Sequence, residues 1–152
     1  MTNPLKEILI EHEGLRLDRY KCPAGANTVG VGHNLDANPI PGLTFPITRE
    51  MAMEILEDDI EAATADLHRE LPWTKNLDEV RHAVLVDMAF NMGIYGLKLF
   101  KNTLAHVKEG MYHAAALNML DSKWAKQVQK SRVDRLVGMM TTGKWPKGFE
   151  PE

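Results

Sequence analysis

A carboxylate, a thiol, a hydroxyl and an imidazole lie close together near the start of this 152-residue chain. They belong to Glu13, Cys22, Thr28 and His33, in a stretch rich in glycine. Cleavage of a glycosidic bond needs a carboxyl group that donates a proton and a group that holds or activates water. These residue types therefore suggest hydrolytic chemistry, although Glu is common and a lone Thr on a strand usually just fills a strand position.

A short helix is predicted to carry the carboxylate. Asn3 and Pro4 favour a helix start, and Gly14 favours a stop, which together predict a helix over 4–13. Glu13 then projects from the C-terminal end of this helix. The helix dipole is negative there and disfavours a second negative charge. The position thus suits a general acid, which must keep its proton until the reaction.

A β-hairpin is predicted to follow this helix. Residues alternate in character over 15–20 and over 28–33, and a Pro-Ala-Gly-Ala-Asn turn joins the two runs. Such a hairpin brings Cys22 and Thr28 back beside Glu13. The sequence therefore predicts one compact group of reactive side chains rather than three isolated ones.

The remaining chain reads as a loop, one long helix and several short helices. Three prolines and a glycine make 34–47 a loop or a short irregular strand. Residues 50–71 lack Pro and Gly and carry an apolar stripe, which predicts a helix of roughly 30 Å that could join two lobes. Short helices are predicted over 78–92, 97–108, 111–120, 122–127 and 132–142.

Composition limits the class of protein. The 44% hydrophobic and 26% charged residues are typical of a globular protein. A single cysteine excludes an intramolecular disulfide and a multi-cysteine zinc site, and we expect no metal and no cofactor. No apolar run approaches the roughly 18 residues that cross a bilayer, and the start has no signal-peptide pattern. We expect no membrane insertion and a cytosolic location as synthesised.

The net charge of −3 hides an asymmetry along the chain. Residues 1–97 carry a balance of −8, whereas residues 98–147 carry +7. A basic half facing a cleft could attract an anionic polymer, either nucleic acid or cell-wall glycan. Solvated helix faces explain the same pattern at least as well.

The motif around the reactive group resembles that of the phage-type lysozymes, or endolysins (glycoside hydrolase family 24). The segments E-G-L-R-L at 13–17 and T-V-G-V-G-H at 28–33 carry this resemblance, with Tyr20 between them. The catalytic motif of the family is Glu, eight residues, Asp or Cys, five residues, Thr. Further similar residues spread through the second half: Arg81, F-N-M-G at 90–93, Gly96, Phe100, Leu104, Asn118, Trp124, Gln127, Arg132 and T-G-K-W at 142–145.

The resemblance implies an α+β fold that is mainly α. One lysozyme-like domain is expected over 1–152, with a small N-terminal lobe and short β-sheet at about 14–50. The connecting helix spans about 50–71, and the all-helical C-terminal lobe spans about 72–152 and includes the first helix, 4–13. A cleft between the lobes would bind peptidoglycan. The expected activity is hydrolysis of the β-1,4 bond between N-acetylmuramic acid and N-acetylglucosamine.

The resemblance also implies catalytic roles. Glu13 is the expected general acid, Thr28 helps to hold the attacking water, and Cys22 occupies a position that is more often Asp. Arg132 aligns with a family arginine that lies near the catalytic glutamate. His33 is expected to make a structural hydrogen bond or ion pair, with an acid of the long helix as a candidate partner.

Further residues are implied in substrate binding or support. Phe90, Thr103 and Asn118 are expected to line the glycan site of the helical lobe. Asn34 stands where the family often has Leu, and Gln127 is expected to support the site. These assignments come from the resemblance rather than from spacing.

Cys22 is the main departure from the commoner motif. A free thiol has a pKa of about 8.5, so little thiolate forms at neutral pH. An ionised Glu13 nearby would raise this pKa, whereas Lys21 or Arg132 could lower it. A neutral thiol can still orient water, and a thiolate could act as base or nucleophile. We favour water positioning and inversion of configuration as the hypothesis.

Two other functions remain open. A lytic transglycosylase would act on the same bond, but it needs no water-handling partner. A catalytically inactive helical module could bind the wall or nucleic acid. The favoured interpretation expects peptidoglycan as partner, no nucleic acid, and a monomer. It also expects residence in the host cytoplasm until a holin-like pore gives access to the periplasm and wall.

Overall fold

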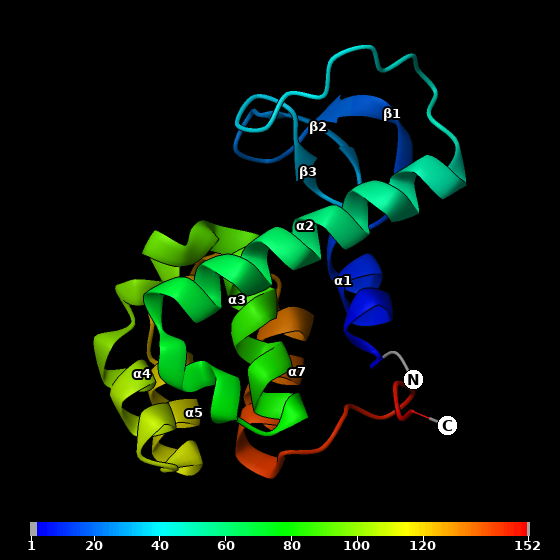
Figure 1. Ribbon diagram of the computed structural model, residues 1–152. Helices are drawn as coiled ribbons and strands as arrows, with labels where there is room; N and C mark the ends of the chain where they lie inside the picture. The colour runs from blue at the N-terminus through cyan, green and yellow to red at the C-terminus, as the bar shows by residue number, and fades with distance from the viewer. Residues whose placement is uncertain (1–2, 152) are drawn as a thin grey trace. The chain divides into compact units, whose positions relative to one another are not determined.

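The structure, a computed structural model, describes residues 3–151 (Figure 1). Residues 1, 2 and 152 of the domain expected over 1–152 lie outside this part. Two compact units form, one up to Ala62 and one from Ala63 onward. The elements are α1 (Leu5–Glu13), β1 (Arg16–Lys21), β2 (Asn27–Gly30), β3 (His33–Asn34), α2 (Arg49–Glu70), a 3₁₀ helix η1 (Pro72–Asn76), α3 (Glu79–Lys98), α4 (Lys101–Lys108), α5 (Tyr112–Leu120), α6 (Lys123–Gln127) and α7 (Lys130–Thr142). The predicted α+β architecture, mainly α with a small sheet, is confirmed.

The first unit contains α1 and a three-stranded antiparallel sheet of order β1-β2-β3. The predicted hairpin is present: Tyr20 pairs with Thr28, and Lys21 pairs with Asn27. The expected short third strand exists as β3, which pairs with β2. Helix α1 groups with the sheet in this unit, whereas the sequence placed it with the helical lobe.

The N-terminal part of α2 closes the apolar side of the sheet. Val29 on β2 is fully buried in one cluster with Ile47, Ala52 and Ile55. Burial of each large aliphatic side chain contributes about 1.5–3 kcal/mol, so this small cluster is enough to hold the sheet on the helix. The hydroxyl of Thr48 accepts the Met51 N–H at 3.0 Å and caps the start of the helix.

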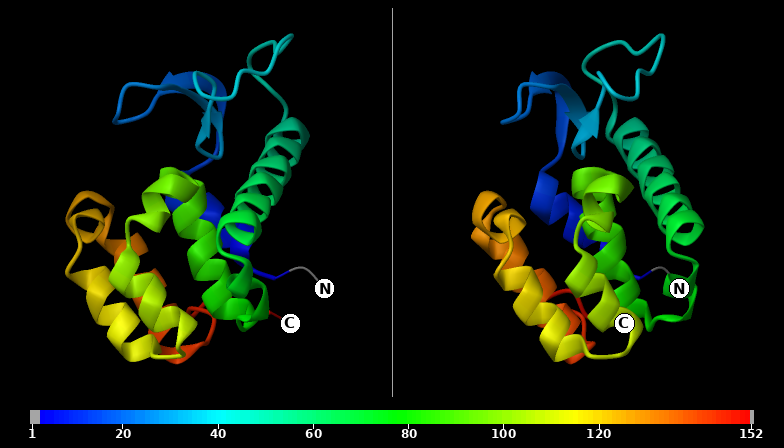
Figure 2. Two further views of the ribbon diagram at one scale, coloured as in Figure 1. Left: turned by 60° about the vertical axis from the view of Figure 1, so that its left-hand side comes forward. Right: turned by 90° about the vertical axis from the view of Figure 1, so that its left-hand side faces the viewer.

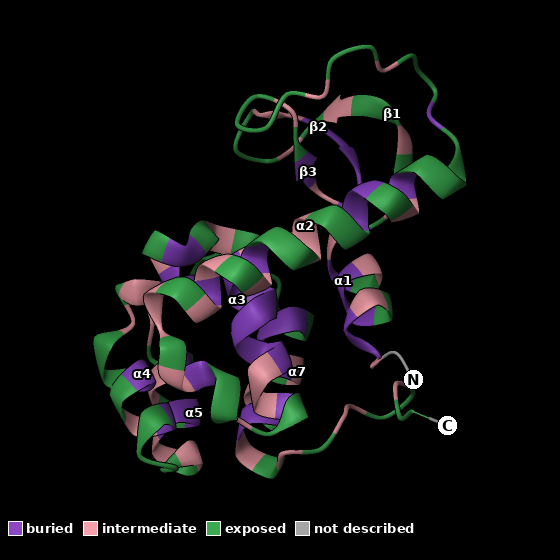
Figure 3. Ribbon diagram, in the orientation of Figure 1, coloured by how far each residue is buried: buried purple, intermediate pink, exposed green. Residues whose placement is uncertain are grey.

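Helix α3 is the centre of the second unit. Residues 83–89 are all buried, which is typical of a helix enclosed by others (Figure 3). Helix α7 packs against α3 and α5, and α5 also packs against α4 (Figure 2). Met88, Met119 and Met139 are among the most deeply buried side chains, so these methionines fill core space.

The helix predicted over 97–108 is wrong. Helix α3 passes through a non-helical residue at Gly93 (φ 79°) and continues to Lys98. A sharp bend of 104° follows before α4 begins at Lys101. Neither Gly nor Pro marks this bend. Phe100 lies in it and packs edge-on against Trp124, with ring centroids 6.2 Å apart, so a tertiary contact rather than a local breaker accompanies it.

Arg81 holds the C-terminal end of α7. Its Nε donates to the carbonyl oxygen of Met140 at 2.9 Å, and its Nη2 donates to that of Thr141 at 3.1 Å. Gly143 ends the helix in the left-handed region (φ 69°), where a Cβ would collide with the Arg81 guanidinium. Two residues of the family resemblance thus have a structural explanation.

A buried ion pair lies in the core of the second unit. Nε and Nη2 of Arg132 both donate to Oδ1 of Asp87, at 3.0 and 2.8 Å. The side chains are 4% and 0% exposed. Removal of one member of such a pair costs far more than removal of both, because the remaining charge stays buried without that partner.

We therefore expect Asp87→Ala to lower the free energy of unfolding by about 3–5 kcal/mol. Urea denaturation followed by circular dichroism measures this loss. Asp134→Ala is the matched control: it removes the exposed Lys130–Asp134 pair and should cost at most about 1 kcal/mol. Equal losses in the two variants would show that the buried pair does not stabilise the unit as described.

Candidate active site

The Glu13 side chain lies against the backbone of Gly32. Glu13 is the last residue of α1, and Gly32 belongs to the turn between β2 and β3. A Cβ on Gly32 would lie 3.0 Å from Glu13 Oε1 and 3.1 Å from its Cδ. Gly32 also has a φ of 67°, which favours glycine. The absence of a side chain at Gly32 therefore makes room for the carboxyl group over the sheet.

Cys22 is the first residue after β1 and begins the hairpin turn. Its N–H donates to the carbonyl oxygen of Ala26 at 3.0 Å, and the Gly25 N–H donates to the Cys22 carbonyl oxygen at 2.8 Å. The turn backbone therefore curls around the thiol. Backbone N–H groups, that of Ala26 first and then that of Ala24, lower the pKa of the Cys22 thiol.

The groups around the thiol differ from those expected. The sequence pointed to Lys21 and Arg132 as the groups that could lower the thiol pKa. Turn amides lower it instead, that of Ala26 most, against an opposing effect of desolvation. Successive backbone N–H groups in a turn form an anion-binding concavity, and no charged side chain is needed for that.

The Thr28 hydroxyl is buried at the start of β2. The residue is 3% exposed, and its Oγ1 donates to the carbonyl oxygen of Ala26 at 2.9 Å. A hydroxyl has one hydrogen and two acceptor lone pairs. With the hydrogen donated to Ala26, the lone pairs can accept a hydrogen bond from a water molecule.

Tyr20 interacts with the predicted catalytic residues. It was not selected from the sequence as a site residue. Burial raises the pKa of the Tyr20 phenol most, and the charge of Glu13 raises it next. The charge of Cys22 also raises it, whereas Arg16, whose guanidinium lies 4.3 Å from the ring centroid, lowers it. Thr28 pairs with Tyr20 across the sheet. Tyr20 thus pairs with one predicted catalytic residue, Thr28, and its pKa responds to the charges of the other two.

His33 makes the ion pair expected with an acid of the long helix. Its Nδ1 lies 2.7 Å from Oδ2 of Asp59 on α2, and its Nε2 lies 2.8 Å from the carbonyl oxygen of Asn38. Both ring nitrogens therefore face acceptors. The hydrogen bond to Asp59 raises the pKa of His33, and burial opposes this rise. His33 links the sheet to α2 and the following loop.

This pair makes stability depend on pH. Since the folded pKa of His33 is raised, its contribution is fully present below the unfolded pKa of about 6.5 and is lost as pH rises through the folded pKa. We expect Asp59→Ala to lower the free energy of unfolding by about 1.5–3 kcal/mol near pH 5.5, and by clearly less near pH 9. Urea denaturation at both pH values measures the difference.

Asp58→Ala, at the exposed neighbouring position, is the control and should show little loss at either pH. A loss for Asp59→Ala that is the same at both pH values would contradict the protonated ion pair.

The Asn34 side chain stabilises a turn in the first unit. Its Oδ1 accepts the backbone N–H groups of Asp36 and Ala37, each at 2.9 Å. This arrangement stabilises the turn after β3. The carbonyl oxygen of the Asn34 side chain, which was expected at the substrate, is therefore engaged within the chain.

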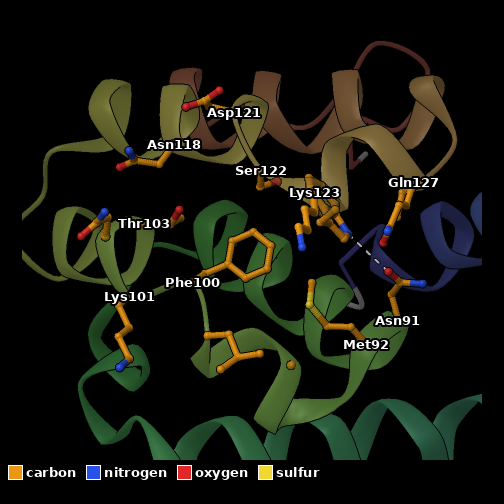
Figure 4. Close-up of a pocket in the computed structure, with 15 residues that line it drawn as sticks. Asn91, Met92, Phe100, Lys101, Thr103, Asn118, Asp121, Ser122, Lys123 and Gln127 are labelled. Atoms are coloured by element: carbon orange, nitrogen blue, oxygen red, sulfur yellow. Dashed lines mark hydrogen bonds between the residues drawn. The ribbon is translucent and has the colours of Figure 1, made fainter.

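A pocket of about 840 Å³ opens in the second unit (Figure 4). Three of the predicted residues line it: Thr103, Asn118 and Gln127. Phe90 does not, and the pocket has Phe100 and Trp124 as its aromatic lining instead. The remaining lining residues are Asn91, Met92, Gly96, Leu99, Lys101, Asn102, Asp121, Ser122, Lys123 and Val128.

Hydrogen bonds fix the orientation of polar groups in this pocket. Nδ1 of His106 lies 2.6 Å from Oδ1 of Asn118, so the imidazole N–H donates and the amide NH₂ is oriented away from it. Nε1 of Trp124 donates to Oδ1 of Asn91 at 3.3 Å (Figure 4). An oriented amide beside aromatic rings is a surface that suits a sugar with hydroxyl and acetamido groups.

Residues 3–151 contain no group of three or more His, Cys, Asp or Glu side chains that could hold a metal ion. Within the same range no single helix is long and apolar enough to cross a membrane, and only the bent pair of α3 and α4 together has that length and composition.

Comparison with known proteins extends these observations over most of the chain. The family described as phage lysozyme matches residues 10–141. A protein of Dictyostelium discoideum named "Probable T4-type lysozyme 1" is 27% identical, over 94% of this chain and 96% of its own length.

Two phage proteins are also similar. The "Endolysin" of Acyrthosiphon pisum secondary endosymbiont phage 1 is 29% identical, over 88% of this chain and 85% of its own. The "Pre-baseplate central spike protein Gp5" of Enterobacteria phage T4 is 29% identical over 91% of this chain, which corresponds to 28% of that protein. The chain therefore belongs to the phage lysozyme family and is a lysozyme-like cell-wall hydrolase.

Proposed function

We propose that the protein hydrolyses the β-1,4 bond between N-acetylmuramic acid and N-acetylglucosamine of peptidoglycan. The observation that carries this proposal is the position of Glu13 against Gly32, just after the strand of Thr28, with Cys22 in the turn before that strand. A proton donor at a helix end and a pair of water-holding groups on the adjoining hairpin supply what glycoside hydrolysis needs. Membership of the phage lysozyme family supports the same reaction class.

Glu13 acts as the general acid in this proposal. It donates its proton to the glycosidic oxygen as the bond to the anomeric carbon breaks. Its position against the Gly32 backbone limits where the carboxyl group can lie. The leaving sugar then departs as a neutral alcohol.

Thr28 and Cys22 hold the attacking water. The Thr28 hydroxyl, whose hydrogen goes to the carbonyl oxygen of Ala26, accepts one hydrogen of the water. Cys22 accepts the other through sulfur, and the lowered pKa of its thiol increases the thiolate fraction that can do so. The water oxygen bonds to the anomeric carbon and loses its proton to the sulfur, so the configuration inverts.

The pocket of the second unit holds the glycan. A sugar face stacks on Phe100, which the buried Trp124 supports edge-on, while Asn118 and Gln127 hydrogen-bond hydroxyl and acetamido groups. Thr103 belongs to the buried part of the lining. Arg132 and His33 support the two units through their ion pairs. No residue contact with nucleic acid is part of the proposal.

The biological role in this proposal is lysis of a bacterial host by a monomeric enzyme. The relative named "Endolysin" supports it. On this proposal the protein stays in the host cytoplasm until a holin-like pore lets it reach the periplasm and wall.

Mass analysis of muropeptides released from purified sacculi tests the reaction. Hydrolysis predicts products that have gained one water and end in a reducing N-acetylmuramic acid. Anhydro products, lighter by one water, would identify a lytic transglycosylase. Products ending in reducing N-acetylglucosamine would place the cut at the other glycosidic bond, and absence of products would indicate an inactive binding module.

A further inference from the structure

Two histidines outside the proposed active site face each other across neighbouring helices of the second unit. Nε2 of His68 on α2 lies 2.8 Å from Nε2 of His82 on α3. The ring centroids are 5.0 Å apart, and the ring planes are inclined by 48°. Both side chains are half-buried, so the pair is held in place and still open to solvent. The proposed reaction uses neither histidine.

The two rings lie close enough to share a metal ion once they turn. Imidazole nitrogen binds Zn²⁺ at about 2.0–2.1 Å, which places two such nitrogens roughly 2.9–3.4 Å apart for bond angles between 90° and the tetrahedral value. The observed 2.8 Å is shorter and is the length of an N–H···N hydrogen bond. With the ring centroids 5.0 Å apart, the two rings point at each other nearly end to end. Metal binding therefore requires both rings to turn, so that their Nε2 lone pairs converge on one point beside the line that joins them.

A histidine that binds a metal ion must be neutral and must offer a nitrogen lone pair. In the hydrogen-bonded pair one Nε2 carries the hydrogen and the other accepts it with its lone pair. Transfer of that hydrogen to Nδ1 of the same ring presents both Nε2 lone pairs to a cation.

Nearby acids on the same helices are occupied elsewhere. Glu70 on α2 accepts from Lys98 at 2.8 Å, and Asp78 at the start of α3 accepts the Arg81 N–H at 3.0 Å. Residues 3–151 also offer no group of three or more ligating side chains. Water must therefore fill the remaining coordination positions. Imidazole ligands with water suit late first-row divalent ions.

We propose that His68 and His82 form a two-histidine site for a late first-row divalent cation, Zn²⁺ or Ni²⁺, which joins α2 to α3. The bound ion replaces the hydrogen bond between the rings with two metal–nitrogen bonds. The site is independent of the proposed glycan chemistry, because it lies on other residues and needs no substrate.

Calorimetric titration of the full chain with NiCl₂ and ZnCl₂ tests this site. The titration uses a Cys22→Ser background, so that the thiol cannot contribute a ligand. We expect one ion per chain. We also expect His68→Gln and His82→Gln each to lower the affinity for the ion by at least about tenfold. Loss of a residue that only supports a metal ligand already costs about this much. His113→Gln, at an exposed histidine of α5, is the matched control and should bind as the parent does.

A spectroscopic readout separates ligation from a packing role. In a ¹H–¹³C spectrum, Ni²⁺ should broaden the ring signals of His68 and His82 before those of His106 and His113. Circular dichroism confirms that each variant is folded. Unchanged affinity in either glutamine variant, absence of binding by the parent, or first broadening at another histidine would overturn the proposal.

Discussion

Replacement of Glu13 by Gln is expected to abolish lysis of outer-membrane-permeabilised Gram-negative cells. Gln has nearly the same size and shape, so it can occupy the space against Gly32. It has no acidic proton to give to the leaving oxygen. Loss of a general acid costs about 10²–10⁴-fold in rate, which takes clearing of a turbid suspension below the usual detection limit.

Glu11→Gln provides the matched control for this variant. Glu11 lies on the same helix, is exposed, and loses the same charge on substitution. Its lysis rate should equal that of the parent. If Glu13→Gln clears the suspension as fast as Glu11→Gln does, Glu13 is not the acid.

Substitution of Cys22 is expected to separate water positioning from simple packing. Cys22→Ala removes the sulfur that accepts the water proton, and we expect a loss of about 10²-fold or more in hydrolysis. Cys22→Asp should keep much of the activity, because the same turn N–H groups that stabilise a thiolate also stabilise a carboxylate. Release of reducing ends from purified sacculi measures both rates.

Alkylation gives an independent check of the same residue. An alkylating reagent should inactivate the parent and leave Cys22→Asp unaffected, since Cys22 is the single cysteine. Thermal unfolding of each variant shows whether a loss comes from misfolding. Full activity in a folded Cys22→Ala would remove the thiol from the mechanism.

Local signals predicted most of the first unit and the long helix. Gly14 ends α1 as expected, and the Pro-Ala-Gly-Ala-Asn turn joins β1 to β2 as expected. The long helix spans Arg49–Glu70, close to the predicted 50–71, because nothing within it interrupts helical spacing. These features depend on turn residues and periodicity, which a sequence displays directly.

Tertiary contacts account for what the sequence did not reveal. The bend before α4 has no Gly or Pro, and its Phe100 packs against Trp124, which is distant in sequence. Asp87, the buried partner of Arg132, lies 45 positions earlier in the chain. The two rings of the pocket likewise come from separate elements, α6 and the bend before α4, so no spacing rule identifies them.

The candidate site likewise combines features that the sequence displays with features that only the folded chain reveals. The predicted hairpin returns the chain to the helix end, and the family resemblance, rather than spacing alone, selected Glu13, Cys22 and Thr28. The groups that lower the thiol pKa are backbone amides of the turn, which no residue type displays. Tyr20 could have been selected from its place opposite Thr28 in a predicted hairpin. The residue types thus indicate the chemistry, and the backbone sets its electrostatics.

The anomeric configuration of the first product tests the proposed mechanism most directly. In that mechanism, water held by Cys22 and Thr28 attacks the face opposite the leaving group. Proton NMR during the first minutes of cleavage of a soluble peptidoglycan fragment, before mutarotation, records which anomer forms. We expect the α-anomer from the β-linked substrate. Initial formation of the β-anomer would mean retention through a covalent intermediate and would contradict the water-holding role of Cys22 and Thr28.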